Sequence, residues 1–113
     1  MDYTPDKWVV IKIVANETGN IHYRVLATWY GGYGGSDSWK MNSGITRVIK
    51  RDDGCFEFFG ESGSVYFCHE NCWGLSGYGS NVLTSYQSHK DTTITMLPEE
   101  TDLTAIEYVV SRA

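Results

Sequence analysis

The segment from Trp29 to Trp39, Trp-Tyr-Gly-Gly-Tyr-Gly-Gly-Ser-Asp-Ser-Trp, combines flat aromatic rings with glycine and small polar residues, and Asn42-Ser43-Gly44 follows closely. Bare backbone beside aromatic rings suits a planar ligand, because a ring can stack on the aromatic side chain while amides and hydroxyls bind its polar edges. The alternative is a long hairpin loop whose rings cover the core. Stacking alone does not distinguish one flat ligand from another.

A second glycine-rich segment, Gly74 to Asn81, runs from a predicted strand into a predicted helix with Ser80 as its N-cap. Free N–H groups and the helix dipole at such a start favour an anion such as phosphate. The segment lacks the Lys-Ser/Thr ending of a P-loop, and its glycine spacing is not the dinucleotide fingerprint, so a structural turn is the alternative. Nearby Arg47, Lys50 and Arg51 would supply counter-charge or form a solvated face.

The run Cys68-His69-Glu70-Asn71-Cys72 contains thiol and imidazole groups, which are preferred zinc ligands. A further ligand would have to be Cys55, His22 or His89. On a strand Cys68 and His69 point to opposite faces, which argues against a shared metal ion. We therefore expect no metal site and no cofactor, and we expect the three cysteines to be reduced thiols.

The carboxylates fall at predicted turns and helix starts, which are ordinary solvated positions. They include Asp52, Asp53, Glu61, Glu99, Glu100 and Asp102. No pair of them suggests general acid and base catalysis. The sequence thus predicts a protein that is not an enzyme and has no catalytic residues.

The elements that position these residues are mainly strands. Predicted strands cover 7–14, 21–30, 45–51, 55–59, 65–69 and 92–96. Helical spacing predicts a helix over about 81–90. It also predicts a last helix that starts at Thr101 or Thr104 and includes Val109 and Val110. The first two strands form a hairpin around Gly19, and the first, rich in β-branched residues, is expected mid-sheet. The predicted fold class is α+β, an antiparallel meander with two short helices packed on one face.

The length of 113 residues predicts a single domain over residues 1–113. Hydrophobic residues make up 42% and charged residues 20%, which are globular values. Eight tyrosines and four tryptophans exceed what so small a core can hide, so some rings should reach the surface. The net charge of −5 argues against duplex nucleic acid as a partner. Lacking a signal-peptide pattern or a long apolar run, the chain is expected in the cytoplasm, without membrane contact.

Three stretches carry a resemblance: Trp29 to Tyr33, Asp37 to Ile45 and Gly60 to His69. Through them, residues 7–83 resemble small uncharacterised proteins of tailed bacteriophages. Size and acidity make the chain similar to phage counter-defence proteins, and to the Thoeris anti-defence sponge family, which binds cyclic ADP-ribose-type signals without cleaving them. This resemblance implies a homo-oligomer with nucleotide pockets at subunit interfaces, acting in the host cytoplasm, and it assigns no individual residue.

The leading hypothesis is a non-catalytic protein that sequesters a small nucleotide-like signalling molecule. The predicted ligand-binding residues are the rings of Trp29, Tyr33, Trp39 and Trp73 and the polar side chains of Ser43, Arg47, Ser64 and Asn81. The hypothesis requires the two glycine-rich segments to lie side by side around a recess. The alternative is an inhibitor that binds a host defence or regulatory protein through an acidic, aromatic patch, and a metal-dependent enzyme is a third.

Overall fold

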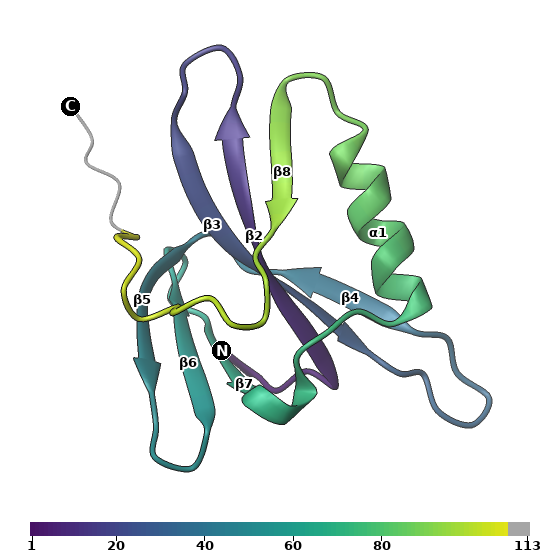
Figure 1. The fold of residues 1–113 in the computed structure, drawn as a ribbon. Coiled ribbons are helices and arrows are strands. Elements are labelled where there is room, and N and C mark those ends of the chain that lie inside the picture. The colour runs from purple at the N-terminus through teal and green to yellow at the C-terminus, as the bar shows by residue number, and fades with distance from the viewer. Residues whose placement is uncertain (109–113) are drawn as a thin grey trace.

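The structure is a computed structural model that describes residues 1–108, which form two four-stranded sheets and one α-helix (Figure 1). The strand order is β1-β7-β6-β5 in the first sheet and β4-β3-β2-β8 in the second. β1 pairs with β7 in parallel, and the other pairs are antiparallel. The elements are β1 Asp2–Tyr3, β2 Lys7–Ala15, β3 Ile21–Trp29, β4 Ser38–Met41, β5 Ile45–Lys50, β6 Cys55–Gly60, β7 Val65–His69, the 3-10 turn η1 Glu70–Cys72, α1 Gly77–Gln87 and β8 Thr92–Met96.

Strands β2 and β3 form the predicted hairpin, paired from Lys7 opposite Thr28 to Val14 opposite Ile21. Gly19 in the turn has a φ of 77°, which glycine adopts without a steric penalty. β2 lies between β3 and β8, inside the second sheet. The prediction of a central strand from its β-branched residues is confirmed.

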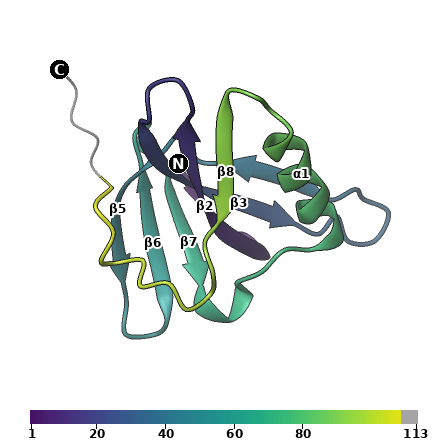
Figure 2. The same cartoon turned by 45° about the horizontal axis from the view of Figure 1, so that its top comes forward.

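The second sheet is covered on both faces, by the first sheet on one side and by α1 on the other (Figure 2). Between the sheets, Trp8 and Val10 of β2 pack with Phe58 and Tyr66 of the first sheet. The core under α1 contains Val9, Ile11, Ile13, Leu26, Leu83 and Ile94. Because side chains alternate along a strand, successive residues of β2 enter different cores.

The single meander predicted from the sequence is wrong, because the strands divide into two packed sheets. β4 was not predicted, since Ser38–Met41 is short, largely exposed and without an apolar alternation. It is held by pairing with β3, in which Trp39 lies opposite Thr28. The two residues of β1 are likewise held by pairing with Val65 and Tyr66 of β7. In both cases a neighbouring strand, and not local sequence, determines the conformation.

The predicted last helix is also wrong over the described residues, because 101–108 form turns. The Asp102 carboxylate accepts bonds from the backbone N–H and the hydroxyl of Thr104, at 3.1 and 2.7 Å, and this local pairing competes with helix formation. Leu103 and Tyr108 are both buried against the core between the sheets. Residues five apart lie about 140° apart around a helix, so a helix could not bury both. Val109 and Val110 lie outside the described residues.

Helix α1 begins at Gly77, four residues before the predicted start, and ends at Gln87. Its N-cap is Ser76, whose Oγ accepts from the N–H of Gly79 at 3.0 Å. Gly79 lies so close to β3 that a Cβ there would be 3.2 Å from Thr28 Cγ2. Glycine in the first turn thus permits tight packing of the helix on the sheet. Within the part of the chain that the structure describes, no helix is long and apolar enough to cross a membrane.

Replacing Ser76 with alanine is expected to lower the free energy of unfolding by about 1 kcal/mol, because the Gly79 N–H loses its capping acceptor. Chemical denaturation followed by circular dichroism measures the change. The matched variant Ser80→Ala removes the N-cap predicted from the sequence, which in the structure is an exposed residue inside the helix. It should leave stability unchanged or slightly raised. If Ser80→Ala lowers the free energy of unfolding more than Ser76→Ala does, then Ser80 and not Ser76 is the N-cap.

Candidate functional site

The register between β3 and β4 directs the two tryptophans that flank the glycine-rich loop to opposite faces of the second sheet. Trp39 lies opposite Thr28, and Trp29 lies opposite Ser38. Directly paired residues share a face, so Trp39 is on the face of α1, where Thr28 approaches Gly79. Trp29, on the other face, is packed against the core between the sheets.

Trp29 is fixed by contacts within the chain. Its indole Nε1 donates to the carbonyl of Thr4 at 2.9 Å, and its ring meets Tyr3 edge-on with centroids 6.3 Å apart. Trp73 is also half-buried and packs against both cores, next to Trp8. These two predicted stacking rings are therefore occupied by packing.

Tyr33 lies in the middle of the loop between β3 and β4, and this loop extends away from the sheets (Figure 1). Its side chain is fully exposed. The loop closes on itself, because the Gly31 N–H donates to the Asp37 carboxylate at 2.9 Å and Gly35 N–H donates to the carbonyl of Gly32. A Cβ on Gly31 would lie 2.3 Å from the backbone of Ser36, so this closed shape requires glycine.

Ser43 and Ser64 are brought together, on either side of Ser62. The Oγ atoms of Ser43 and Ser62 are 3.1 Å apart, and those of Ser62 and Ser64 are 3.5 Å apart. Ser62 N–H also donates to Ser43 Oγ at 2.9 Å. Arg47 is not bonded to these serines; its guanidinium lies over the ring of Phe59, 4.3 Å from the centroid. These hydroxyls join the β4–β5 connection to the β6–β7 turn.

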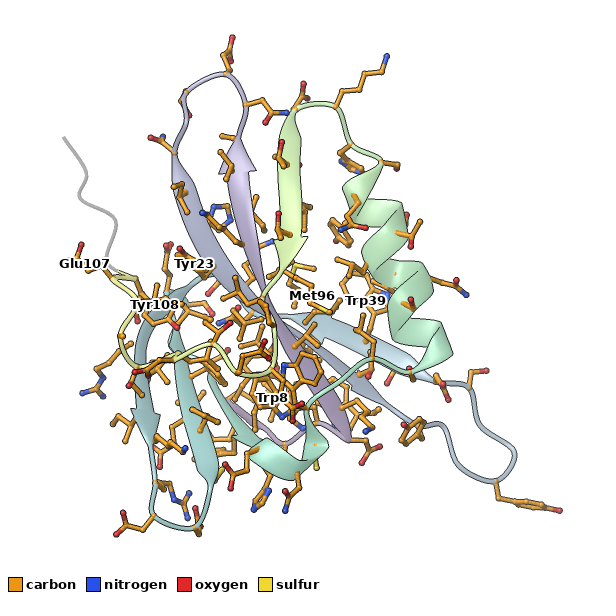
Figure 3. All side chains as sticks on the ribbon, in the orientation of Figure 1. Trp8, Tyr23, Trp39, Met96, Glu107 and Tyr108 are labelled. Carbon is orange, nitrogen blue, oxygen red and sulfur yellow. The ribbon has the colours of Figure 1, made fainter. Side chains whose placement is uncertain are left out.

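Trp39 and Asn81 are the two predicted residues that share a pocket. It has a volume of about 350 Å³ and lies between β4 and α1. Its lining is Trp39, Tyr78, Asn81, Val82, Ser85 and Tyr86. Trp39 is 37% exposed and lies beside α1 (Figure 3). We call this cavity the Trp39 pocket.

The walls of the Trp39 pocket are aromatic and uncharged. The rings of Trp39 and Tyr86 meet edge-on, with centroids 5.6 Å apart and planes at 81°. The His89 ring stacks on Tyr86, with centroids 5.9 Å apart. Asn81 and Ser85 are one helical turn apart and supply an amide and a hydroxyl. The pocket can receive a flat ring with polar edges.

The sequence did not identify Tyr78 and Tyr86 as site residues. Their signal is helical spacing, since Tyr78, Val82, Ser85 and Tyr86 are separated by three or four residues and share one face of α1. That spacing is visible only once the helix is known to begin at Gly77. Residues 77–81 of the second glycine-rich segment form the first turn of this helix, which is already capped by Ser76, so the segment has the structural role that was the alternative to a phosphate loop.

The residues from Cys68 to Cys72, which were considered as zinc ligands, have other roles. Both ring nitrogens of His69 contact the backbone, because Nδ1 accepts from Asn71 N–H and Nε2 lies 3.1 Å from the carbonyl of Asp53. Cys68 is fully buried, and this burial raises the pKa of its thiol well above the ordinary value, so the thiol stays protonated. The three cysteines are free. Residues 1–108 contain no group of three side chains arranged to hold a metal ion.

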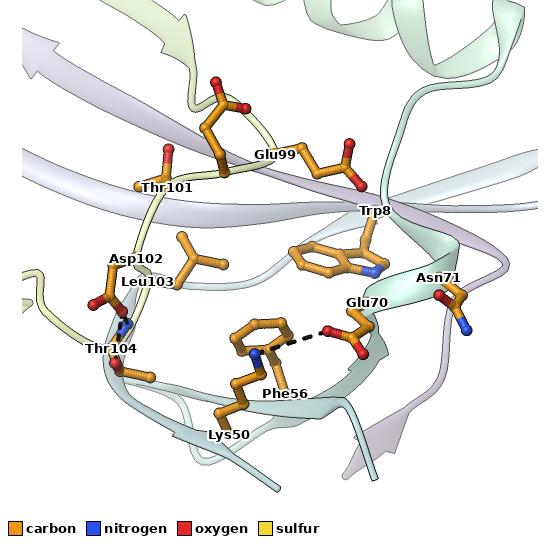
Figure 4. Close-up of a pocket in the computed structure, with 11 residues that line it drawn as sticks. Trp8, Lys50, Phe56, Glu70, Asn71, Glu99, Thr101, Asp102, Leu103 and Thr104 are labelled. Carbon is orange, nitrogen blue, oxygen red and sulfur yellow. Dashed lines mark hydrogen bonds and ion pairs between the residues drawn. The ribbon is translucent and has the colours of Figure 1, made fainter. Parts of the chain in front are cut away.

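A larger cavity, of about 590 Å³, contains none of the predicted binding residues. It lies between η1, β5, β6 and the segment 99–104 (Figure 4). Its charge is quite different from that of the Trp39 pocket, since carboxylates dominate its lining. The Trp39 pocket is thus aromatic and neutral, whereas the larger cavity is acidic. In comparisons with protein families, curated proteins and solved structures, no match to this chain was found.

Proposed function

We propose that this protein is a non-catalytic binder of a small nucleotide-like molecule whose ring enters the Trp39 pocket. The observation that carries the proposal is the partly exposed Trp39 ring, which meets Tyr86 edge-on in the wall of a pocket of about 350 Å³, with an amide and a hydroxyl beside it. A flat ring stacked on Trp39 gains dispersion and desolvation energy. The Asn81 amide, which both donates and accepts, would bind the polar edge of the ring.

More specifically, the protein would sequester the ligand without changing it chemically. The six lining residues include no carboxylate, imidazole or thiol, the groups that most often act as acid, base or nucleophile. A bound ligand would thus leave unaltered. The resemblance to nucleotide-signal sponges of phages is consistent with this activity in the cytoplasm of a host cell. It also implies a homo-oligomer, which sedimentation equilibrium would measure.

Calorimetry with a panel of cyclic nucleotides and ADP-ribose isomers tests the proposal. At least one compound is expected to bind, and chromatography of the released ligand should recover it unchanged. Trp39→Ala should weaken this binding about 5- to 150-fold, because stacking of a base on an aromatic side chain contributes about 1–3 kcal/mol.

The matched control is Tyr33→Ala, which removes a fully exposed aromatic ring from a loop outside the pocket. It should leave the affinity unchanged. The proposal fails if no compound in the panel binds, if the recovered ligand is altered, or if Tyr33→Ala and Trp39→Ala weaken binding equally. Circular dichroism of each variant checks that the fold is retained.

The second candidate function is inhibition of a host defence or regulatory protein. It is favoured by two exposed rings in the loop between β3 and β4. Tyr33 is fully exposed, and Tyr30 is 52% exposed. Aromatic side chains are enriched at the energetic centres of protein interfaces. This candidate predicts one stoichiometric host partner in a pull-down, lost on Tyr33→Ala and kept on Trp39→Ala. The reverse pattern would assign the binding to the Trp39 pocket.

A further inference from the structure

The larger cavity combines an apolar floor with an acidic rim. Its floor is formed by Trp8, Phe56 and Leu103, whose side chains are at most 9% exposed. Four carboxylates stand around it, together with a single ammonium group, that of Lys50. The carboxylates belong to Glu70, Glu99 and Asp102, which are labelled in Figure 4, and to Glu100. We call this cavity the acidic pocket.

The ammonium group of Lys50 lies in the acidic pocket, next to an aromatic ring and a carboxylate. Its Nζ lies 5.4 Å from the centroid of the Phe56 ring and 3.8 Å from Glu70 Oε1 (Figure 4). A cation placed over an aromatic face and next to a carboxylate makes two favourable electrostatic contacts. The Lys50 and Glu70 side chains are each half exposed, so their ion pair is weak and can exchange for another.

A second carboxylate is held in place across the cavity. Thr104 donates both its backbone N–H and its hydroxyl to Oδ1 of Asp102. These bonds, and then the charge of Lys50, lower the pKa of Asp102, which therefore stays ionised in weakly acidic solution. The carboxylate is thus oriented before any ligand arrives, which reduces the entropy lost on binding.

We propose that the acidic pocket binds a guanidinium or ammonium group from outside the chain, over the Phe56 ring and between the carboxylates of its rim. A guanidinium suits it best, because a planar cation stacks on an aromatic face and bonds a carboxylate through two N–H groups. The incoming cation takes the place of Lys50, which swings into solvent. Anionic ligands, including nucleotides, are repelled by the same rim.

This site is separate from the proposed nucleotide site. The acidic pocket and the Trp39 pocket share no lining residue. Either proposal can therefore fail without the other. The guanidinium group has two sources, a free small molecule or an arginine side chain of another protein, and the probes below separate them.

The test uses N-acetyl-arginine amide and its uncharged isostere N-acetyl-citrulline amide, titrated into the intact protein and followed by NMR. The arginine probe is expected to saturate with a Kd on the order of millimolar and to shift the amide signals of Lys50 and Leu103. The citrulline probe should bind at least about tenfold more weakly, because it lacks the charge. Equal binding of both probes, or shifts confined to other regions, would overturn the proposal.

Substitutions distinguish a local site from general attraction to an acidic protein. Lys50→Gln removes the competing cation and should strengthen arginine binding roughly two- to fivefold, whereas Glu70→Gln should weaken it by a similar factor. The matched controls are Arg51→Gln and Glu17→Gln, which make the same charge changes outside the acidic pocket. They should leave the affinity unchanged. If Arg51→Gln strengthens binding as much as Lys50→Gln, the effect is long-range and no specific site exists.

Binding of a peptide probe identifies the source of the cation. The probe is a five-residue peptide with one central arginine between glycines, compared with N-acetyl-arginine amide. Binding at least about tenfold tighter than the amide supports recognition of an arginine within a protein chain. Equal binding supports a small organic cation. Loss of binding by both probes contradicts the site itself.

Discussion

Replacing Trp8 with alanine is expected to lower the free energy of unfolding by about 3–5 kcal/mol. The indole is 1% exposed and contacts the rings of Phe56 and Phe58, with centroids 5.7 and 5.5 Å away. Its Nε1 also donates to the carbonyl of His69, the last residue of β7, 2.7 Å away. Alanine would leave a cavity between the sheets and an unpaired carbonyl. Since small domains are stable by about 5–15 kcal/mol, much of the stability would be lost.

Guanidinium denaturation followed by far-ultraviolet circular dichroism measures this loss, because the signal does not depend on indole fluorescence. Trp8→Phe retains most of the ring volume and should cost less than Trp8→Ala. Trp39→Ala is the matched control, since Trp39 is the same residue type on an exposed edge strand. It should cost less than about 2 kcal/mol. Equal losses from Trp8→Ala and Trp39→Ala would contradict the assignment of Trp8 to the core.

Raising the pH from 10 to 12 is expected to reduce stability by roughly 2–3 kcal/mol through Tyr66 alone. Burial raises the pKa of Tyr66 to about 12, from an ordinary value near 10. Between these values the unfolded chain loses the phenolic proton while the folded chain keeps it. The contribution of protonated Tyr66 to the free energy of unfolding is thus fully present below pH 10. It is lost as the pH rises toward 12, at about 1.4 kcal/mol per pH unit. Burial raises the pKa of Tyr108 and of Cys68 too, in the same direction.

Urea denaturation at pH 8, 10, 11 and 12 measures this dependence. Tyr66→Phe removes the ionisable hydroxyl and should make stability fall less steeply with pH. Tyr33→Phe is the matched control, because Tyr33 is fully exposed. Its variant should follow the wild-type curve. Identical slopes for wild type and Tyr66→Phe would show that Tyr66 ionises in the folded state as readily as in water.

The strands with strong local patterns could be predicted from the sequence. The bounds of β7 and β8 agree with the prediction, and those of β2, β3, β5 and β6 differ by a residue or less at each end. These strands are rich in β-branched and aromatic residues. The misses, β1 and β4, are short and depend on a partner strand. A helix was expected at 101–108 because Thr104 and Glu107 have the three-residue spacing of a capping box. In the structure the Asp102–Thr104 bonds and the burial of Leu103 and Tyr108 hold the segment in turns.

The candidate site was predictable only in part. The sequence singled out Trp29 and Trp39 alike, because they flank the same glycine-rich loop. Their different environments follow from strand register, which places one on each face of the sheet. Register is a tertiary property, and no pattern within the loop encodes it. For the same reason the pairing of Trp39 with Tyr86, 47 positions along the chain, required the packing of α1 on the sheet.

Strand β2 gives Trp8 and Val10 to one core and Val9 and Ile11 to the other. The first sheet packs on one face of β2 and α1 packs on the other. Neither can separate from the molecule without exposing the buried side chains of β2. Its amide protons should accordingly exchange with deuterated solvent only when the whole molecule opens, and at one common rate. A ligand bound in either pocket would stabilise the folded molecule against this opening and would therefore slow the exchange of the β2 amides.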